Sequence, residues 1–263
     1  MPDELRLPDE RRRRAAWLAM LAFGPDAVAV GPCALALHGV SGLPAVVVPE
    51  IALPWGKPAH PRDGIRPRYF DKFATTVVGG RRIAGLDAAL VQALPELPRS
   101  CAVAVLDDVL HRRAVDDERL ARIRSAIRGR RGAAGVDGWW GLVDRRAESP
   151  LETEARLACI DDGIPPDELQ VEICDADGQL LGRGDLGWRL RDGRWLLAEI
   201  DGRSIHDAPA AIYHDRLRQN RLVASGRVEL LRFTKADLGP HGVLVTTIRA
   251  ALVADASNHR RSA

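Results

Sequence analysis

Cysteine is scarce in this chain, and the spacing of the few cysteines excludes two classes of protein. Cys33, Cys101, Cys159 and Cys174 lie far apart and form no Cys-x-x-Cys pair. Zinc knuckles and small disulfide-stabilised folds depend on closely spaced cysteines. The sequence therefore argues against both and indicates buried free thiols in a reducing cytosol.

Long apolar runs are also missing. The first residues, MPDELRLPDERRRR, lack the apolar core of a secretory signal, and no stretch is long enough to span a bilayer. We therefore expect a soluble, cytoplasmic protein without a membrane partner. A hydrophobic content of 46% over 263 residues is enough for a sizeable core in one large or two ordinary domains.

Lysine is rare, so arginine carries almost all of the positive charge. Lysine occurs at Lys57, Lys72 and Lys235, and the net charge is only +2. Arginine forms bidentate hydrogen bonds to phosphate more readily than lysine does, which favours a nucleic-acid partner. A GC-rich genome, which favours arginine codons, explains the same bias without any function, and both explanations stay open.

The first half of the chain predicts an α+β region over residues 1–135. Residues 1–10 are polar and expected to be loose, and the Gly-rich segment 129–138 precedes a domain boundary between about 132 and 148. An arginine-rich segment, Arg112–Arg131, covers the exposed face of one predicted helix and the residues after it. Helices are expected from Arg11 through Leu21 and over 32–38, 86–94, 101–112 and 117–128, and strands over 45–49, 65–70, 75–78 and 81–84, with Gly79-Gly80 as a hairpin turn.

The second half, residues 149–256, predicts an α/β domain with one mixed sheet flanked by helices. It opens on Ser149-Pro150-Leu151-Glu152, a capping-box pattern at a helix start. A crossover helix between the third and fourth strands predicts that these two strands pair in parallel. Strands are expected over 169–174, 184–190, 195–200 and 228–233, and helices over 149–161, 209–225 and 243–254.

Three acidic residues on two adjacent predicted strands carry the main functional signal. Because side chains alternate along a strand, Glu199 and Asp201 share one face, whereas Ala198 and Ile200 point into apolar packing. Together with Asp185 they would repel one another unless a cation, a shared proton or water offsets the repulsion. A divalent metal held by carboxylate oxygens is the simplest solution, and an edge strand with solvated acids is the alternative.

The surroundings of Asp185 agree with either interpretation. Gly184 and Gly187 flank it in sequence, and their small size leaves room for a ligand or for a close backbone approach. Glu152 fits the N3 position of the capping box, a structural role that does not exclude a functional one beside a metal.

Further polar residues follow the acidic strand. His206 could order a water or contact a phosphate, and it fits equally well as a solvated loop residue. Arg216 and Arg221 lie on the helix expected over 209–225, where they either hold a phosphodiester or form a solvated face. Arg232 is expected to pair with a neighbouring acid such as Glu229.

Several blocks of the second half together resemble a known family. The blocks are SPLETEARL (149–157), GRGDLGW (182–188), AEIDG (198–202) with His206, HDRLRQNRLVASG (214–226) and LLRFTKADL (230–238). Their order and spacing resemble the domain of unknown function related to very-short-patch-repair endonucleases, within the PD-(D/E)xK restriction-endonuclease-like group.

This resemblance implies a restriction-endonuclease-like core in which Asp185 and Glu199 bind magnesium or manganese. Asp201 stands where the wider group usually has the lysine that positions the attacking water, and the closer family also shows Glu-x-Asp. An aspartate supplies no positive charge, so the resemblance implies a third metal ligand or a base at this position.

The first half resembles the AbiEi-type antitoxin family. The matching features are ALALHGV (34–40), the strand pair around VVVP and GIRPRYF, and AVAVLDDVL (102–110). This resemblance implies an antitoxin-like module and a protein partner from a defence or toxin–antitoxin system.

We therefore expect a magnesium-dependent endonuclease that hydrolyses DNA. Glu152, Asp185, Glu199 and Asp201 are the expected catalytic set, and His206, Arg216 and Arg221 are expected to contact the nucleic acid. One alternative is a DNA-binding regulator with an inactive nuclease-like domain, which would bind duplex through Arg112–Arg131 without metal. A protein-interaction domain without any nucleic-acid role is a third.

Overall fold

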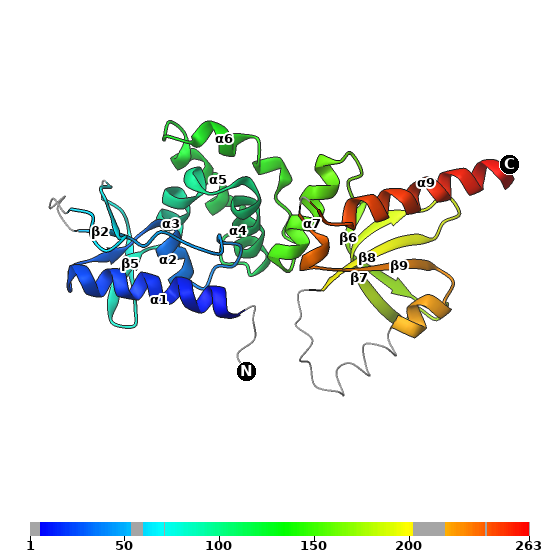
Figure 1. The fold of residues 1–263 in the computed structure, drawn as a ribbon, viewed down its shortest axis with the longest axis horizontal. Coiled ribbons are helices and arrows are strands. Elements are labelled where there is room, and N and C mark those ends of the chain that lie inside the picture. Colours follow the sequence, from blue (N-terminus) through cyan, green and yellow to red (C-terminus); the bar gives the residue numbers. More distant parts are fainter. Residues whose placement is uncertain (1–5, 54–59, 71, 202–218, 240, 263) are drawn as a thin grey trace. The chain divides into compact units, whose positions relative to one another are not determined.

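The computed structural model describes residues 6–53, 60–70, 72–201, 219–239 and 241–262 (Figure 1). The chain divides into two compact units, residues 1–145 and 146–263, which we call the N-terminal and C-terminal units. Both combine helices with a mixed sheet, which confirms the predicted α/β fold class. No helix in the described part of the chain is long and apolar enough to cross a membrane.

The N-terminal unit packs helices against a five-stranded sheet with the strand order β3-β2-β1-β5-β4. Its core includes Met20, Leu35, Ile51, Ile83 and Leu106, all fully buried. The elements are α1 (Arg6–Phe23), β1 (Val28–Ala29), α2 (Gly31–Leu37), β2 (Glu50–Ala52), β3 (Arg66–Arg68), β4 (Thr75–Val78), β5 (Arg81–Ala84), α3 (Leu86–Ala93), η2 (Leu94–Glu96), α4 (Arg99–His111), α5 (Asp117–Ile127), α6 (Ala133–Asp137) and η3 (Trp140–Leu142).

Two predictions for this unit were wrong. Helix α1 begins at Arg6, within the segment expected to be loose. The apolar run 45–49 is not a strand, and the strand begins instead at Glu50. Val46 and Val48 are exposed, whereas Ile51 is fully buried and pairs with Ala29 of β1. Core burial decided the location of the strand, and Pro49, which has no N–H to donate, lies just before it.

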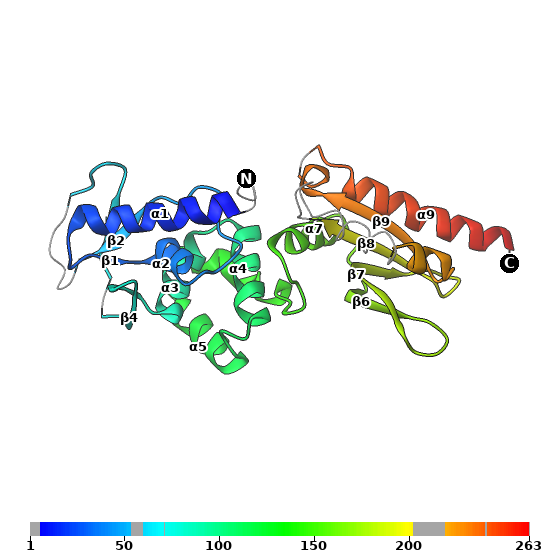
Figure 2. The same ribbon diagram turned by 90° about the horizontal axis from the view of Figure 1, so that it is seen from below.

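The C-terminal unit contains a four-stranded sheet with the order β6-β7-β8-β9 (Figures 1 and 2). Strands β6, β7 and β8 pair antiparallel, and β8 pairs parallel to β9, as the crossover helix predicted. The elements are α7 (Pro150–Asp161), β6 (Glu168–Cys174), β7 (Leu180–Arg189), β8 (Trp195–Asp201), β9 (Val228–Thr234), η4 (Lys235–Asp237) and α9 (Leu244–Ser262).

Helices α7 and α9 pack against one face of this sheet. Cys159 of α7 and Ile248 of α9 are fully buried in a cluster with Leu186, Ala198 and Ile200 of β7 and β8. Ala198 and Ile200 therefore point into apolar packing, as the strand alternation predicted. Glu199 lies between them and is directed to the other side of β8.

All four cysteines are free thiols. Cys33 and Cys159 are buried, and burial raises the pKa of each thiol to about 12. The neutral thiol is therefore the stable form of both residues at physiological pH, which fits a packing role.

Candidate functional site

Helix α7 fixes Glu152 at its first turn. The Ser149 hydroxyl accepts a hydrogen bond from the Glu152 N–H at 3.2 Å, and Pro150 occupies the first helical position. In a capping box the N3 carboxylate receives the N-cap N–H. Here Glu152 Oε2 receives the N–H of Glu148 instead, at 2.8 Å, one residue before the N-cap. The Glu152 carboxylate is thus held at the helix start.

The protonation of Glu152 is strongly perturbed. Burial leaves the residue 7% exposed and raises the pKa of its carboxyl to about 7. The hydrogen bond from Glu148 opposes this rise, and the negative charge of Asp185 adds to it. Glu152 therefore exchanges a proton near neutral pH, and its charge is coupled to that of a residue on β7.

Asp185 of β7 contacts β8 next to Glu199. The antiparallel register of the two strands runs from Arg189 opposite Trp195 to Leu186 opposite Ala198, and Asp185 follows the last of these pairs. Asp185 Oδ2 accepts a hydrogen bond from the backbone N–H of Ile200 at 2.7 Å. Asp185 is thereby fixed to the backbone of β8 at the residue that follows Glu199.

Arg232 of β9 supplies the cation that offsets the acids of β8. The parallel register pairs Glu199 with Arg232, whose Nε lies 3.4 Å from Glu199 Oε2 and whose Nη2 lies 3.0 Å from Asp201 Oδ2. Glu199 is only 6% exposed. The expectation that Arg232 pairs with a neighbouring acid is confirmed, but its partners are Glu199 and Asp201, whereas Glu229, the acid named as an example, pairs with Arg194 at 2.9 Å.

Gln170 of β6 belongs to the same group, and sequence reasoning missed it. Its Nε2 donates to Glu152 Oε2 at 2.8 Å, and its Oε1 is buried with no hydrogen-bond partner among the described residues. Its backbone has φ +56°, a left-handed value that costs a non-glycine residue about 1 kcal/mol or more. Strain and an unsatisfied buried oxygen together are typical of functional sites.

At the left-handed residue Gln170, the apolar side chains of β6 change from one face of the sheet to the other. Leu169 packs in the cluster under α7 and α9, whereas Val171 packs in a second cluster with Leu197 and Leu222. In a regular strand these two residues would share one face. The register pairs Leu169 with Leu186 and Val171 with Gly184, so Gln170 lies opposite Asp185.

The glycines around Asp185 do not leave room for a ligand, contrary to the expectation. A Cβ at Gly184 would lie 3.0 Å from Leu197, and one at Gly187 would lie 2.6 Å from Val171. The space beside both glycines is filled by core side chains. These glycines are therefore required for packing, and access to Asp185 has to come from another direction.

The remaining site predictions fall outside this group. His206 and Arg216 lie outside the described residues. Arg221 lines a pocket with Asp175 and Leu181, near the start of β7 and four residues before Asp185. No three His, Cys, Asp or Glu side chains in the described ranges are grouped closely enough to hold a metal ion by themselves.

The arginine-rich segment of the N-terminal unit is partly neutralised. Four of its eight arginines pair with acids of the same unit, which weakens it as a free basic surface. The ion pairs are Arg112–Asp108 (2.9 Å), Arg119–Asp87 (2.6 Å), Arg122–Glu118 (2.6 Å) and Arg124–Asp137 (3.3 Å).

The chain is similar to two mycobacterial proteins whose names describe them as uncharacterized. The chain is 34% identical over 149 residues to "Uncharacterized protein MT2308" of Mycobacterium tuberculosis (strain CDC 1551 / Oshkosh) and to "Uncharacterized protein Rv2248" of Mycobacterium tuberculosis (strain ATCC 25618 / H37Rv). The match covers 57% of this chain and 54% of each relative, so the chain spans about half the length of the curated relatives it matches. No protein-family model matches the chain, and no solved structure does.

Proposed function

We propose that the C-terminal unit is a metal-dependent phosphodiesterase that hydrolyses DNA. The observation that carries the proposal is the position of Asp185 between Glu152 of α7 and the end of β8. Burial and the charge of Asp185 raise the pKa of Glu152, and the Asp185 carboxylate accepts the N–H of Ile200, the residue after Glu199. A carboxyl whose pKa is raised by burial and by a neighbouring carboxylate is typical of acid–base and metal sites.

The donor chemistry fits magnesium or manganese. Magnesium is usually bound by one or two carboxylates, while waters and substrate phosphate oxygens complete its coordination. Asp185 and Glu199 would be those two carboxylates. When bound, such an ion polarises the phosphate and lowers the pKa of a coordinated water.

Glu152 would act as the proton acceptor. Its Oε2 receives the N–H groups of Glu148 and Gln170, so the proton of the neutral form is held on Oε1. A carboxyl with a pKa of about 7 can take a proton from an attacking water and release it near neutral pH. Gln170 would keep Glu152 in the orientation that this transfer requires.

Arg232 would take over the positive charge of the lysine usual in the PD-(D/E)xK group. It reaches the site from β9, and Asp201 holds its guanidinium through a 3.0 Å contact. With 41% of its side chain exposed, Arg232 is accessible to a phosphate, whose developing charge it would stabilise. In this proposal Asp201 orients Arg232 and is not itself the base.

The test is cleavage of supercoiled plasmid by the purified full chain in magnesium or manganese, compared with chelator. The variants Asp185→Asn and Glu199→Gln should each reduce the rate by about 100-fold or more, since each removes a metal-binding charge. Glu229→Gln is the matched control, because Glu229 lies on the same sheet and pairs only with Arg194 among the contacts described above. Cleavage that persists in the Asp185/Glu199 double variant, or in chelator, excludes the proposal.

DNA-binding assays on the same purified protein test the alternative function, a DNA-binding regulator. A DNA-binding protein with an inactive nuclease-like domain would bind duplex in chelator, with an affinity that falls steeply as salt rises. The ion pairs that arginines of the segment Arg112–Arg131 form with acids weaken this segment as a DNA-binding surface. Gel shifts in chelator at several salt concentrations, together with an absence of cleavage in magnesium, would favour that alternative.

A further inference from the structure

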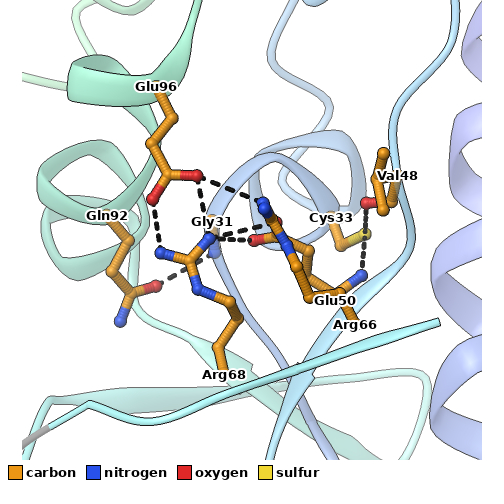
Figure 3. A network of polar contacts seen from close by, with 8 residues as sticks. All are labelled: Gly31, Cys33, Val48, Glu50, Arg66, Arg68, Gln92 and Glu96. Atoms are coloured by element: carbon orange, nitrogen blue, oxygen red, sulfur yellow. Dashed lines mark hydrogen bonds and ion pairs between the residues drawn. The ribbon is translucent and has the colours of Figure 1, made fainter. Parts of the chain in front are cut away.

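A second polar cluster lies in the N-terminal unit, and it has the opposite balance of charge (Figure 3). Strands β2 and β3 pair in parallel, with Glu50 opposite Arg66 and Ala52 opposite Arg68. Arg66 and Arg68 are two residues apart on one strand, so they present their side chains on the same face. Both reach Glu50 and Glu96.

Glu50 anchors the two arginines. It is only 2% exposed, and Arg68 Nη1 lies 3.0 Å from each of its carboxylate oxygens, while Arg66 Nη2 contacts Oε1. A buried carboxylate requires such compensation, so both guanidinium groups are held in place. Arg68 is thereby fixed with 19% of its side chain exposed.

Glu96 occupies the outer side of Arg68. Figure 3 shows its carboxylate facing the guanidinium, with Arg68 Nη1 2.9 Å from Oε2 and Nη2 in contact with Oε1. Two parallel N–H···O bonds of this kind are the geometry by which arginine also binds phosphate. Glu96 is 41% exposed, so it is held less firmly than Glu50 and is the group that a ligand anion can replace.

A pocket opens beside this contact. Its volume is about 630 Å³, and Arg66, Arg68, Glu96, Arg131, Pro95 and Gly132 line it. This volume falls within the roughly 300–1,000 Å³ typical of small-molecule sites.

Gly132 brings Arg131 to the pocket. Gly132 has φ +87°, and a Cβ there would lie 2.3 Å from the Pro95 carbonyl oxygen, so only glycine fits. Arg131 is exposed and makes no ion pair with any described residue. Three guanidinium groups and the Glu96 carboxylate therefore line the pocket. With the buried Glu50, which pairs with Arg66 and Arg68, the net charge of the cluster is +1.

We propose that this pocket binds the terminal phosphate of a small phosphorylated molecule. The phosphate would displace Glu96 from Arg68, gain contacts with Arg66 and Arg131, and leave the buried Glu50 contacts in place. A phosphate monoester carries about two negative charges at neutral pH, which suits a site with several guanidinium groups. This site belongs to the N-terminal unit and does not depend on the proposed nuclease activity.

Isothermal titration of the full chain at low ionic strength tests the proposal. The probes are adenosine 5′-monophosphate, inorganic phosphate, adenosine, and a short DNA duplex without terminal phosphates. Binding of the monophosphate and of phosphate, but not of adenosine, is expected. Equal binding of adenosine, binding of the duplex alone, or no heat from any probe at millimolar concentration overturns the assignment.

Two variants give changes of opposite sign. Glu96→Gln should tighten monophosphate binding by about threefold to tenfold, because the competing carboxylate charge is lost. Arg131→Gln should weaken it by about the same factor, whereas the neighbouring Arg130→Gln, outside the pocket, should leave it unchanged. Both positions are partly or fully exposed, so these proteins should fold. Weaker or unaltered binding in Glu96→Gln contradicts the proposal.

Discussion

The two polar clusters of this protein use the same residue types in opposite proportions. In the N-terminal unit, arginines outnumber carboxylates around a pocket, and in the C-terminal unit, carboxylates outnumber arginine on a sheet. The first cluster comprises Glu50, Arg66, Arg68, Glu96 and Arg131, and the second comprises Glu152, Asp185, Glu199, Asp201 and Arg232.

The different balance of charge in the two clusters shifts the pKa values of Glu96 and Glu152 in opposite directions. The hydrogen bond and charge of Arg68 lower the pKa of Glu96 below its ordinary value, although partial burial opposes this. Burial and the charge of Asp185 raise the pKa of Glu152 to about 7. Neighbouring charge and burial therefore determine whether such a cluster suits an anion or a cation, and each can be altered separately.

The largest stability effect is expected at the centre of the arginine-rich cluster. Glu50→Gln removes the buried charge that compensates Arg66 and Arg68. We expect a loss of about 2–4 kcal/mol in the free energy of unfolding, less than for a fully buried pair because Arg66 is half exposed. Urea unfolding measures this loss. Glu118→Gln is the control, because the Glu118 carboxylate is 83% exposed and its charge should contribute less than about 0.5 kcal/mol to stability. Similar losses in both variants would show that Glu50 does not anchor the cluster.

The next effect is a pH dependence set by Glu152. Its pKa in the folded protein is about 7, above the ordinary 4.5, so the folded state binds the proton more tightly than the unfolded state does. The stabilisation from this proton is complete below pH 4.5 and is lost as the pH rises to 7 and above. Glu152→Gln, which is neutral throughout, should flatten this dependence and exceed the wild type above pH 7 by up to about 3 kcal/mol.

Urea unfolding across pH 4–8 measures the difference. Glu154→Gln is a suitable control, because Glu154 is exposed on the same helix. A wild-type stability that stays constant or rises between pH 4.5 and 7 relative to Glu152→Gln would refute the raised pKa.

A smaller effect on stability is expected when the negative charge of Asp185 is removed. Asp185→Asn can still accept the Ile200 N–H but removes a charge that raises the pKa of Glu152. We expect that pKa to fall and the free energy of unfolding at pH 8 to rise by about 1 kcal/mol. Carboxyl carbon NMR titration and urea unfolding report the two quantities. A less stable variant would mean that Asp185 is a structural anchor.

The smallest effect is expected at Gln170. Gln170→Leu removes the N–H donor that favours the charged form of Glu152, so the pKa of Glu152 should rise further. The same NMR titration measures it, with Gln179→Leu on the exposed turn as the control. An unchanged Glu152 titration would show that the hydrogen bond has no influence on the site.

Strand alternation was sufficient to predict that Glu199 and Asp201 share one side of β8, where both contact Arg232. The Asp192-Gly193 turn joins β7 to β8, and period-two alternation then gives Glu199 and Asp201 a common side. The true partner of Arg232 was not predictable in this way. It depends on the register between β8 and β9, which a long crossover separates in sequence, so the nearby Glu229 was the wrong choice.

The arginine pocket could not be predicted for a related reason. Its anchor, Glu50, follows an apolar run that looks more like a strand than the segment Glu50–Ala52 does. Arg68 of β3 and Glu96 of η2, which meet at the pocket, are 28 residues apart in the sequence. Burial of Ile51 and the pairing of β2 with β3 bring them together, and neither leaves a local sequence signal.

The reversed backbone at Gln170 has a consequence for how changes in β6 are tolerated. On either side of this residue the strand supplies an apolar group to a different hydrophobic layer, Leu169 to one and Val171 to the other. Lengthening or shortening β6 by one residue before Gln170 would exchange those assignments and turn the glutamine amide away from α7. A change of strand length here would therefore disturb the packing of both hydrophobic layers and the orientation of Glu152 at the same time.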